Sequence, residues 1–357
     1  MKRVKTAVFL VSIALAPSLA RADDAPAFFR LQSALNLGGS GAGWDHIDYD
    51  PTAHRAYLSR RGDGLTVVDT VAGKSLGEVA NAKGSGAMDV APKLDRGFTA
   101  NGDGSSSVFR LSDLAPIDRV SFGDNFDGVL YDDTTNLLAY QQPRNSREIF
   151  VDPATMKLLG AVELEGKEPE RPVTDDKGVL YIAMRDTNLA YKIDMRERKI
   201  LAKWDVSSAC RQPSGSAFDV AGHRLLLPCR NDGEKPVIAV VDADTGAITA
   251  TLPTGRGADD VLLDSAGARL FVPCGTDAVV NIFHRDGPDA YTLSETLQSR
   301  PGMRTARYDA ESRRLYGITA EGYFDPAKKP NPRAGAQGPN AFFRGTFVFL
   351  TFGLGQP

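Results

Sequence analysis

Aspartate, arginine and histidine side chains recur just ahead of short apolar runs in this chain, and they are the residues best suited to chemistry. Arginine supplies planar, forked hydrogen-bond donors, while aspartate supplies acceptors or metal ligands, so together they suit a small polar molecule. Ion pairs and aspartate-capped turns produce the same composition, so each residue alone has a structural alternative. The candidate ligand-binding residues are Asp45, His46, Asp127, Arg171, Arg230, Asp259, Asp260 and Arg304.

His46 is the candidate for acid–base work, because it lies beside Asp45 and an imidazole titrates near neutral pH. The alternative is a hydrogen-bonded histidine in the wall of the site. Carboxylates are also ligands for a divalent metal, for which the candidates are Asp45, Asp127 and Asp260. No other cofactor is indicated.

Familiar catalytic motifs are absent from the sequence. There is no GxSxG nucleophile elbow and no HExxH motif, and the glycines of 38–43 do not lie between a strand and a helix. Hydrolysis by a Ser-His-Asp triad therefore has no support. A metal-assisted lactone hydrolase or a lyase stays open, with His46 and the acidic residues as its acid–base or metal group.

The elements that position these residues are short strands, which the stretch 237–283 illustrates. Its apolar runs are rich in β-branched and aromatic residues and are bounded by Asp, Gly, Ser or Thr: Val237–Asp242, Ala247–Leu252, Asp260–Asp264 and Leu270–Cys274. That is the pattern of strands joined by tight turns. None of these runs is long enough to predict a helix.

The same unit recurs along the chain. A turn residue ahead of each second strand marks the units, at Asp50, Ala91, Asp132, Asp175, Asp219, Asp264 and Asp309. The markers lie about 41 to 45 residues apart, a period typical of propeller blades. The last unit lacks a fourth strand and residues 31–37 form a spare one, so we expect 31–37 to pair with 346–350. The prediction is an all-β, seven-bladed β-propeller whose ring closes through the N-terminal strand, leaving few exposed sheet edges.

Strand alternation predicts which residues share a face of the propeller. The connection between blades and the turn between second and third strands lie on one side, here called the entry face. All eight candidate residues lie in such segments, so we expect them at the mouth of the central channel, where concave sites bind ligands. The turns also contribute Arg61, Arg185 and Thr276, whereas His54 and His223 fall on the opposite face and His284 follows a third strand.

The amino-acid sequence of the first unit resembles a known repeat. It reads Asp48-Tyr-Asp-Pro51, Arg55-Ala-Tyr-Leu-Ser59, Leu65-Thr-Val-Val-Asp-Thr70 and Gly73-Lys-Ser-Leu-Gly77. This is similar to the bacterial YVTN-type β-propeller repeat, in which a Tyr-Val-containing second strand precedes a third strand ending in Asp. The resemblance implies a propeller over most of the chain. Related propellers include binding proteins, lactonases and dehydrogenase subunits, so function must be argued from the site.

The first 22 residues have the features of a secretory signal peptide. Lys2, Arg3 and Lys5 precede an apolar run from Ala7 to Ala16, and Ala20-Arg21-Ala22 fits a signal-peptidase site. The run is too short to span a bilayer as a retained helix, and an N-terminal amphipathic helix is the alternative. We expect a domain of residues 23–357, exported to the periplasm or beyond, with no transmembrane segment after removal of the signal.

Charge and cysteine content narrow the partners and the compartment. The formal net charge is −3, and losing the basic leader makes the domain more acidic, which argues against nucleic acid. An odd count of three cysteines in an oxidising compartment implies one pair and one free thiol, or an intermolecular bond. We predict a Cys210–Cys229 disulfide, with both residues on one face of the fifth blade. The rival pair is Cys229 with Cys274.

Three functions stay open on the sequence. The first is an exported, monomeric propeller that binds a small polar molecule or a periplasmic protein without catalysis. The second is the lactone hydrolase or lyase, and the third is a scaffold or accessory subunit of a periplasmic oxidoreductase. An insertion at 321–345, with Lys328, Lys329 and Arg333, either crosses the acidic mouth as a lid or is a surface loop.

Overall fold

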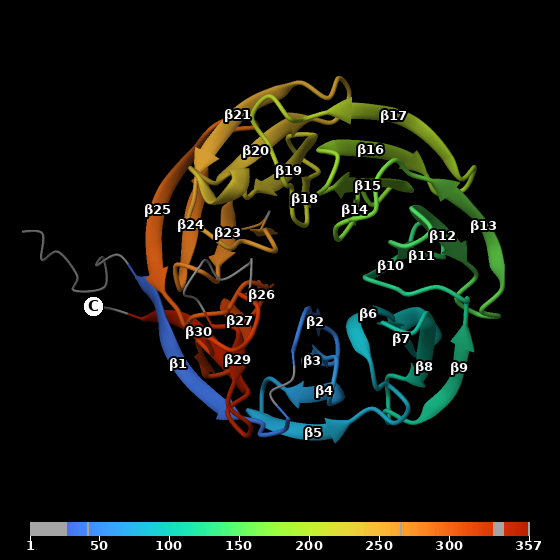
Figure 1. The fold of residues 1–357 in the computed structure, drawn as a ribbon, viewed down its shortest axis with the longest axis vertical. Helices are drawn as coiled ribbons and strands as arrows, with labels where there is room; N and C mark the ends of the chain where they lie inside the picture. The colour runs from blue at the N-terminus through green and yellow to red at the C-terminus, as the bar shows by residue number, and fades with distance from the viewer. Residues whose placement is uncertain (1–26, 41–42, 265, 267, 331–338, 356–357) are drawn as a thin grey trace, which may run out of the picture.

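The chain forms a closed ring of four-stranded antiparallel sheets around a central channel (Figure 1). The structure is a computed structural model that describes residues 27–40, 43–264, 266, 268–330 and 339–355. Within these residues there are seven four-stranded sheets, so the predicted seven-bladed β-propeller is confirmed. The leader of residues 1–22 lies outside the described residues. None of the described residues belongs to a helix with the length and apolarity that a membrane span requires.

Each blade runs from an inner strand at the channel to an outer strand at the rim. Blades one to three comprise β2 (Ile47–Asp50), β3 (Arg55–Arg60), β4 (Gly64–Asp69) and β5 (Lys74–Glu78); β6 (Ser85–Ala91), β7 (Arg96–Asn101), β8 (Ser105–Arg110) and β9 (Pro116–Ser121); β10 (Val129–Asp132), β11 (Leu137–Gln142), β12 (Arg147–Val151) and β13 (Leu158–Glu163). Blades four and five comprise β14 (Val173–Thr174), β15 (Val179–Met184), β16 (Leu189–Asp194) and β17 (Lys199–Asp205); β18 (Ala217–Asp219), β19 (Arg224–Cys229), β20 (Val237–Asp242) and β21 (Ile248–Pro253). Blades six and seven comprise β22 (Leu262–Asp264), β23 (Arg269–Cys274), β24 (Val279–Arg285) and β25 (Tyr291–Gln298); β26 (Ala306–Asp309), β27 (Arg314–Thr319), β30 (Val348–Gly355) and β1 (Phe28–Asn36). Two short 3₁₀ turns, η1 (Pro92–Leu94) and η2 (Asn231–Gly233), and a hairpin of β28 (Gly322–Tyr323) and β29 (Ala341–Phe342) complete the described elements.

The core lies between neighbouring blades. The second and third strands of a blade are almost wholly buried, as in β3 and β4, whereas an outer strand such as β5 is exposed along its length. Aromatic residues of second strands stack on inner-strand aromatics of the next blade. The ring centroids of Tyr181 and Phe218 are 4.8 Å apart, and those of Phe271 and Tyr308 are 4.6 Å apart. These pairs join the separate sheets, because each blade alone exposes two apolar faces.

The recurring aspartate has a structural cause. It ends the inner strand, and its carboxylate accepts hydrogen bonds from backbone N–H groups of the following turn, at 2.8 Å from Thr52 to Asp50 and 2.7 Å from Thr135 to Asp132. The turn then needs a residue with positive φ before the second strand. His54 has φ 50° there and Asn136 has φ 55°. His54 is therefore a turn residue of the opposite face, and His223, with φ 53°, occupies the matching position in blade five.

The ring closes as the sequence predicts. β1 is the outer strand of blade seven and pairs antiparallel with β30, with Leu35 opposite Phe349 and Asn36 opposite Val348. Figure 1 shows the first and last strands side by side, in blue and red. The pairing extends to Phe28 and Gly355, beyond the range read from the sequence. The two ends of the described chain thus share one sheet.

The insertion at 321–345 contains a short hairpin, whereas the sequence predicted a lid or a surface loop without strands. The Phe343 N–H donates to the Glu321 carbonyl oxygen at 2.9 Å, which aligns β28 with β29. Phe342 packs edge-on to Trp44 with ring centroids 4.6 Å apart, so the base of the hairpin is anchored to blade one. Lys328 contacts Asp325 at 3.7 Å, within the insertion itself. Residues 331–338, with Arg333, lie outside the described residues, and the lid stays a prediction.

Candidate functional site

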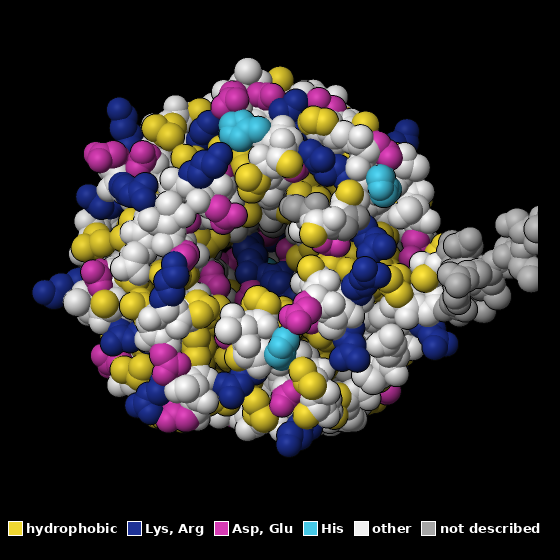
Figure 2. Space-filling model, turned by 180° about the vertical axis from the view of Figure 1, so that it is seen from behind, with side chains coloured by type: hydrophobic (Ala, Val, Ile, Leu, Met, Phe, Trp, Pro, Cys, Tyr) yellow, Lys and Arg dark blue, Asp and Glu magenta, His cyan; other side chains and the backbone are white. Residues whose placement is uncertain are grey.

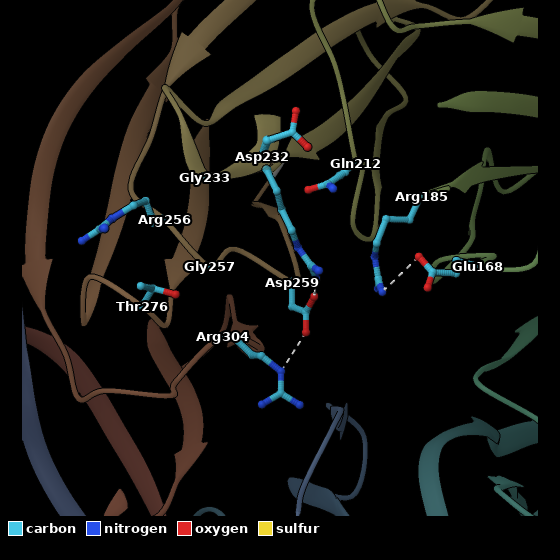
Figure 3. A pocket seen from close by; sticks show the side chains of 11 residues that line it. Glu168, Arg185, Gln212, Asp232, Gly233, Arg256, Gly257, Asp259, Thr276 and Arg304 are labelled. Carbon is cyan, nitrogen blue, oxygen red and sulfur yellow. Dashed lines mark hydrogen bonds and ion pairs between the residues drawn. The ribbon is translucent and has the colours of Figure 1, made fainter. Parts of the chain in front are cut away.

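A cavity of about 520 Å³ opens on the entry face over blades four to seven (Figure 3). Both kinds of entry-face segment line it, as strand alternation predicts. Inter-blade connections contribute Glu168, Gln212, Arg256, Gly257, Asp259 and Arg304, and turns after second strands contribute Arg185, Arg230, Asp232, Gly233 and Thr276. Small-molecule sites in proteins commonly have about 300 to 1,000 Å³, so this cavity has the size of a ligand site.

A disulfide holds one wall of this cavity. Cys210 and Cys229 are bonded and Cys274 is a buried free thiol, so the predicted pairing is confirmed and the rival pair is wrong. The bond joins the connection into blade five to the end of β19. Just beyond it, the Arg230 N–H donates to the Gln212 carbonyl oxygen at 3.2 Å. Two lining residues are thereby fixed next to a covalent cross-link.

Arginine side chains dominate the cavity, and their directions differ. In Figure 3 the guanidinium groups of Arg185 and Arg304 point toward the channel, whereas that of Arg256 points away from it. Arg256 pairs with Asp277 at 2.6 Å, and Arg185 pairs with Glu170 and with Glu168, the latter at 3.7 Å. Arg256 therefore lines the cavity with its stem, while Arg185 and Arg304 present charge to its channel side.

A chain of alternating charges follows the mouth of the channel. Arg304 Nε donates to Asp259 at 2.7 Å, and Arg304 Nη2 lies 3.3 Å from Asp45. Burial opposes ionisation of Asp45, but His46, Arg61 and Arg304 outweigh it and lower its pKa to about 2. From blade five to blade three, this chain of alternating charges consists of the side chains of Arg230, Asp259, Arg304, Asp45, Arg61 and Asp127.

His46 lies in a narrow hollow at the centre of the mouth, which it shares with Asp127 and Arg171. The hollow has a volume of about 10 Å³, close to the space of one water molecule. Burial lowers the pKa of His46, against the opposing charge of Asp45, whose carboxylate lies 4.0 Å away. Burial therefore disfavours the charged imidazolium form of His46. Its Nδ1 is buried and has no hydrogen-bond partner among the described residues.

Asp260 and Arg171 belong to a deeper network within the channel. Arg307 bridges Asp260, at 2.5 Å, and Asp48, at 2.9 Å, and Arg171 contacts Asp48 at 2.5 Å. Burial raises the pKa of Asp260 to about 7, although Arg171 opposes this, and burial beside Asp48 raises the pKa of Asp89 to about 7. Seen from the other side of the ring, the centre is hollowed, with Lys and Arg side chains inside it (Figure 2). The network ties blades one, four, six and seven together across the channel.

The predicted site residues thus separate into three groups. Arg230, Asp259 and Arg304 line the large cavity; Asp45, His46, Asp127, Arg171 and again Asp259 line the narrow hollow; Asp260 lies deeper. Of the three carboxylates considered for a metal, Asp45 and Asp127 both contact Arg61, whereas Asp260 contacts Arg307 in the deeper network. Within the described residues, no group of three or more His, Cys, Asp or Glu is placed to hold a metal ion.

Several cavity residues were not among the sequence candidates. They are Glu168, Arg185, Gln212, Asp232, Arg256 and Thr276. Strand alternation places Arg185 and Thr276 on the entry face, so a signal existed for these two. Gln212 and Arg256 lie further from their inner strands, in connections whose path depends on the disulfide and on Asp277. The spacing of the repeats alone could not show that Gln212 and Arg256 line the cavity.

Solved structures share this fold at low sequence identity. A chain of Kuenenia stuttgartiensis hydrazine synthase superposes with a TM-score of 0.67 and 15% identity, covering 79% of this chain and 94% of that chain. A chain of a mitotic checkpoint complex gives a TM-score of 0.70 and 12% identity, covering 88% and 96%. Neither a scan against protein-family models nor a search of curated proteins finds a match. Likeness at these identities establishes the fold alone.

Proposed function

We propose that this protein is an exported β-propeller of the YVTN-type repeat that binds a small polar molecule without catalysis. The observation that carries the proposal is the entry-face cavity of about 520 Å³, lined by side chains from four consecutive blades. Its lining is polar and charged, and its wall is held by the Cys210–Cys229 bond. A disulfide also fits an oxidising compartment, which supports export.

The arrangement of charges favours binding over catalysis. The carboxylates of the mouth are engaged by arginines, which holds them as ionised acceptors and not as metal ligands or acids. His46 lies outside the large cavity, in a hollow with room for about one water. No residue orients its ring by a hydrogen bond to Nδ1 within the described chain, whereas a general base is held in place by such a partner. A rigid, pre-formed cavity with fixed donors and acceptors suits recognition.

Thermal unfolding in the presence of small molecules tests this function. The full chain is expressed with its leader, and the exported protein is collected. This protein is then screened with neutral, cationic and anionic polar compounds. A ligand that binds only the folded state raises the melting temperature. The same compounds are then tested on Thr276→Trp, which fills the cavity, and on Thr155→Trp, which adds the same ring at an exposed turn of blade three.

We expect at least one compound class to stabilise the wild type and Thr155→Trp but not Thr276→Trp. Failure of every class to stabilise the wild type, or equal stabilisation of Thr276→Trp, would contradict a cavity-binding function. N-terminal sequencing of the exported protein checks removal of residues 1–22. A retained leader in the mature protein would contradict the proposed export.

A further inference from the structure

We infer that the ligand of the entry-face cavity bears an oxoanion group, a carboxylate or a phosphate, and that Arg230 is the residue that selects it. This inference rests on the proposed function and names the chemistry of its ligand. Its basis is the way in which the arginines of the cavity are already engaged by the protein.

Arg230 ends the chain of alternating charges. Each inner member of the chain contacts two partners of opposite sign: Asp259 is flanked by Arg230 and Arg304, and Arg304 by Asp259 and Asp45. Within the described residues, the guanidinium of Arg230 has a single carboxylate partner, Asp259, which it contacts through Nη2. Its Nε and Nη1 make no hydrogen bond with any residue that the structure describes. The Arg230 guanidinium therefore combines positive charge with two donor nitrogens that no described residue engages.

The other arginines of the cavity are more fully committed. Arg304 donates to Asp259 and to the Trp44 carbonyl oxygen, both at 2.7 Å, and its guanidinium carbon lies 5.9 Å from the Trp44 ring centre. Arg256 donates Nε and Nη2 to Asp277 and points away from the channel (Figure 3). Arg185 has carboxylate partners on both sides. Among the described residues, Arg230 thus has one carboxylate partner, whereas Arg304 and Arg185 each have two.

Arg230 is also held in place before a ligand arrives. Its side chain is 17% exposed, its Nη2 is fixed by Asp259, and its backbone follows Cys229 of the disulfide directly and precedes η2. A guanidinium presents its donors as a planar fork that matches the two oxygens of a carboxylate or phosphate. Because the protein has already ordered this side chain, an anion loses little free energy in ordering it.

The rest of the lining indicates what accompanies the anionic group. The side chains of Glu168 and Asp232 are 52% and 54% exposed, and they line the same cavity. Their carboxylates accept hydrogen bonds, and the Gln212 side chain both donates and accepts. A ligand with hydroxyl or ammonium donors beside its anionic group matches these residues. Hydroxy acids, amino acids and sugar phosphates have this chemistry.

The test measures binding of defined probes by isothermal titration calorimetry. The probes are sodium gluconate, sodium glutamate and inorganic phosphate, with sorbitol as the neutral counterpart of gluconate and sodium chloride for matched ionic strength. The variants are Arg230→Gln and Arg230→Lys. Arg110→Gln is the control, since it removes the same charge from an exposed position of blade two, where it pairs with Asp113.

We expect an anionic probe, but not sorbitol, to bind the wild type and Arg110→Gln with affinities within about twofold of each other. Arg230→Gln should weaken that binding by about tenfold or more, the scale of one charge-assisted bidentate contact. Arg230→Lys should fall between them, because it keeps the charge and loses the fork. The carboxylate and phosphate arms distinguish the two oxoanions. Arg230→Lys also guards against the case in which Arg230→Gln fails to fold.

Two results would overturn the inference while leaving the proposed function intact. One is binding of sorbitol or of another neutral compound that Thr276→Trp abolishes and Arg230→Gln leaves unchanged. The other is binding of an anion with wild-type affinity in both Arg230 variants. Binding of no probe and no screening compound would instead contradict the proposed function itself.

Discussion

Glu148 is a carboxyl group in an environment that disfavours its charge. It lies in β12 with no solvent exposure, and its Oε1 accepts a hydrogen bond of 2.7 Å from Gln141. Its Oε2 is buried without a partner among the described residues. Burial raises the pKa of Glu148 from 4.5 to about 8, although the Gln141 bond opposes this. The folded protein therefore holds a neutral acid at pH 7.

The sign of the resulting pH dependence follows from linkage. A group whose pKa is higher in the folded state stabilises the fold fully below its unfolded pKa and loses that contribution as pH rises through the folded pKa. For Glu148 the free energy of unfolding should fall between about pH 4.5 and pH 8, by several kcal/mol at most. Glu148→Gln keeps the shape and cannot ionise, so its stability should fall less over this range and exceed that of the wild type at pH 9.

Urea unfolding at pH 5.5, 7 and 9 measures this difference. Glu163→Gln is the matched control, because it makes the same change at an exposed position of the neighbouring strand β13. Asp89 and Asp260 keep their own raised pKa values in both proteins, so their contribution cancels in the comparison. Parallel pH profiles for the wild type and Glu148→Gln would show that Glu148 is already ionised in the folded protein.

Adjacent residues in this site have different roles, which limits what spacing can predict. Asp259 faces the mouth and contacts Arg230 and Arg304, while Asp260 faces the channel and contacts Arg307. The sequence identified both as entry-face residues, because the repeat gives their position along the blade. The sequence did not show that Asp259 and Asp260 have different partners. The partner of Asp260 is Arg307 in β26, and this contact depends on the curvature of the ring.

Among the elements, the connection into blade five depends on a covalent bond. The Cys210–Cys229 disulfide closes a loop with a sequence separation of 19. In the chain-entropy model such a loop is worth about 3 kcal/mol. We expect the Cys210→Ala/Cys229→Ala double variant to unfold with a free energy lower by about that amount. Ligand binding should weaken as well, because Gln212 and Arg230 flank the bond.

Denaturant unfolding with and without a reductant tests the disulfide. Reductant should lower the stability of the wild type toward that of the double variant and leave the double variant unchanged. Cys274→Ala should remain as sensitive to reductant as the wild type, since Cys274 is a free thiol. A double variant that keeps wild-type stability would show that the bond adds nothing to this wall.

The regular elements were predictable where the pattern is repeated and strong. Second strands such as β15 and β23 combine apolar runs with a preceding turn, and their positions agree with the structure. Inner strands are harder, because β14 has only two residues and its marker, Asp175, lies just after it. The hairpin of β28 and β29 was missed, since its two short strands lie at opposite ends of the proline-rich insertion.

At the scale of the whole molecule, ring closure was predictable because the two irregular ends of the repeat can form one complete blade together. A spare first strand and an incomplete last blade complement each other, and pairing them covers the edge of β30. The repeat pattern could not show which interactions stabilise the pairing of β1 with β30. β1 is exposed along most of its length, so little of its stability comes from buried apolar surface.

Phe29 is the exception in β1 and joins blade seven to blade six. It is 5% exposed, and its ring lies edge-on to Phe271 of blade six at 5.4 Å and to Tyr308 at 6.3 Å. Phe29→Ala should therefore lower the free energy of unfolding by about 3 kcal/mol or more, the usual cost of removing a buried phenylalanine ring. Phe28→Ala is the matched control and should have little effect, because Phe28 is 43% exposed on the same strand.

Deleting residues 23–38 should lower the melting temperature further and promote aggregation, since it uncovers the edge of β30. Calorimetry and light scattering on the three proteins measure both effects. Equal melting temperatures for Phe29→Ala and Phe28→Ala would place the closure energy in the backbone pairing of β1 and β30, and an unchanged melt after the deletion would mean that the ring does not depend on β1.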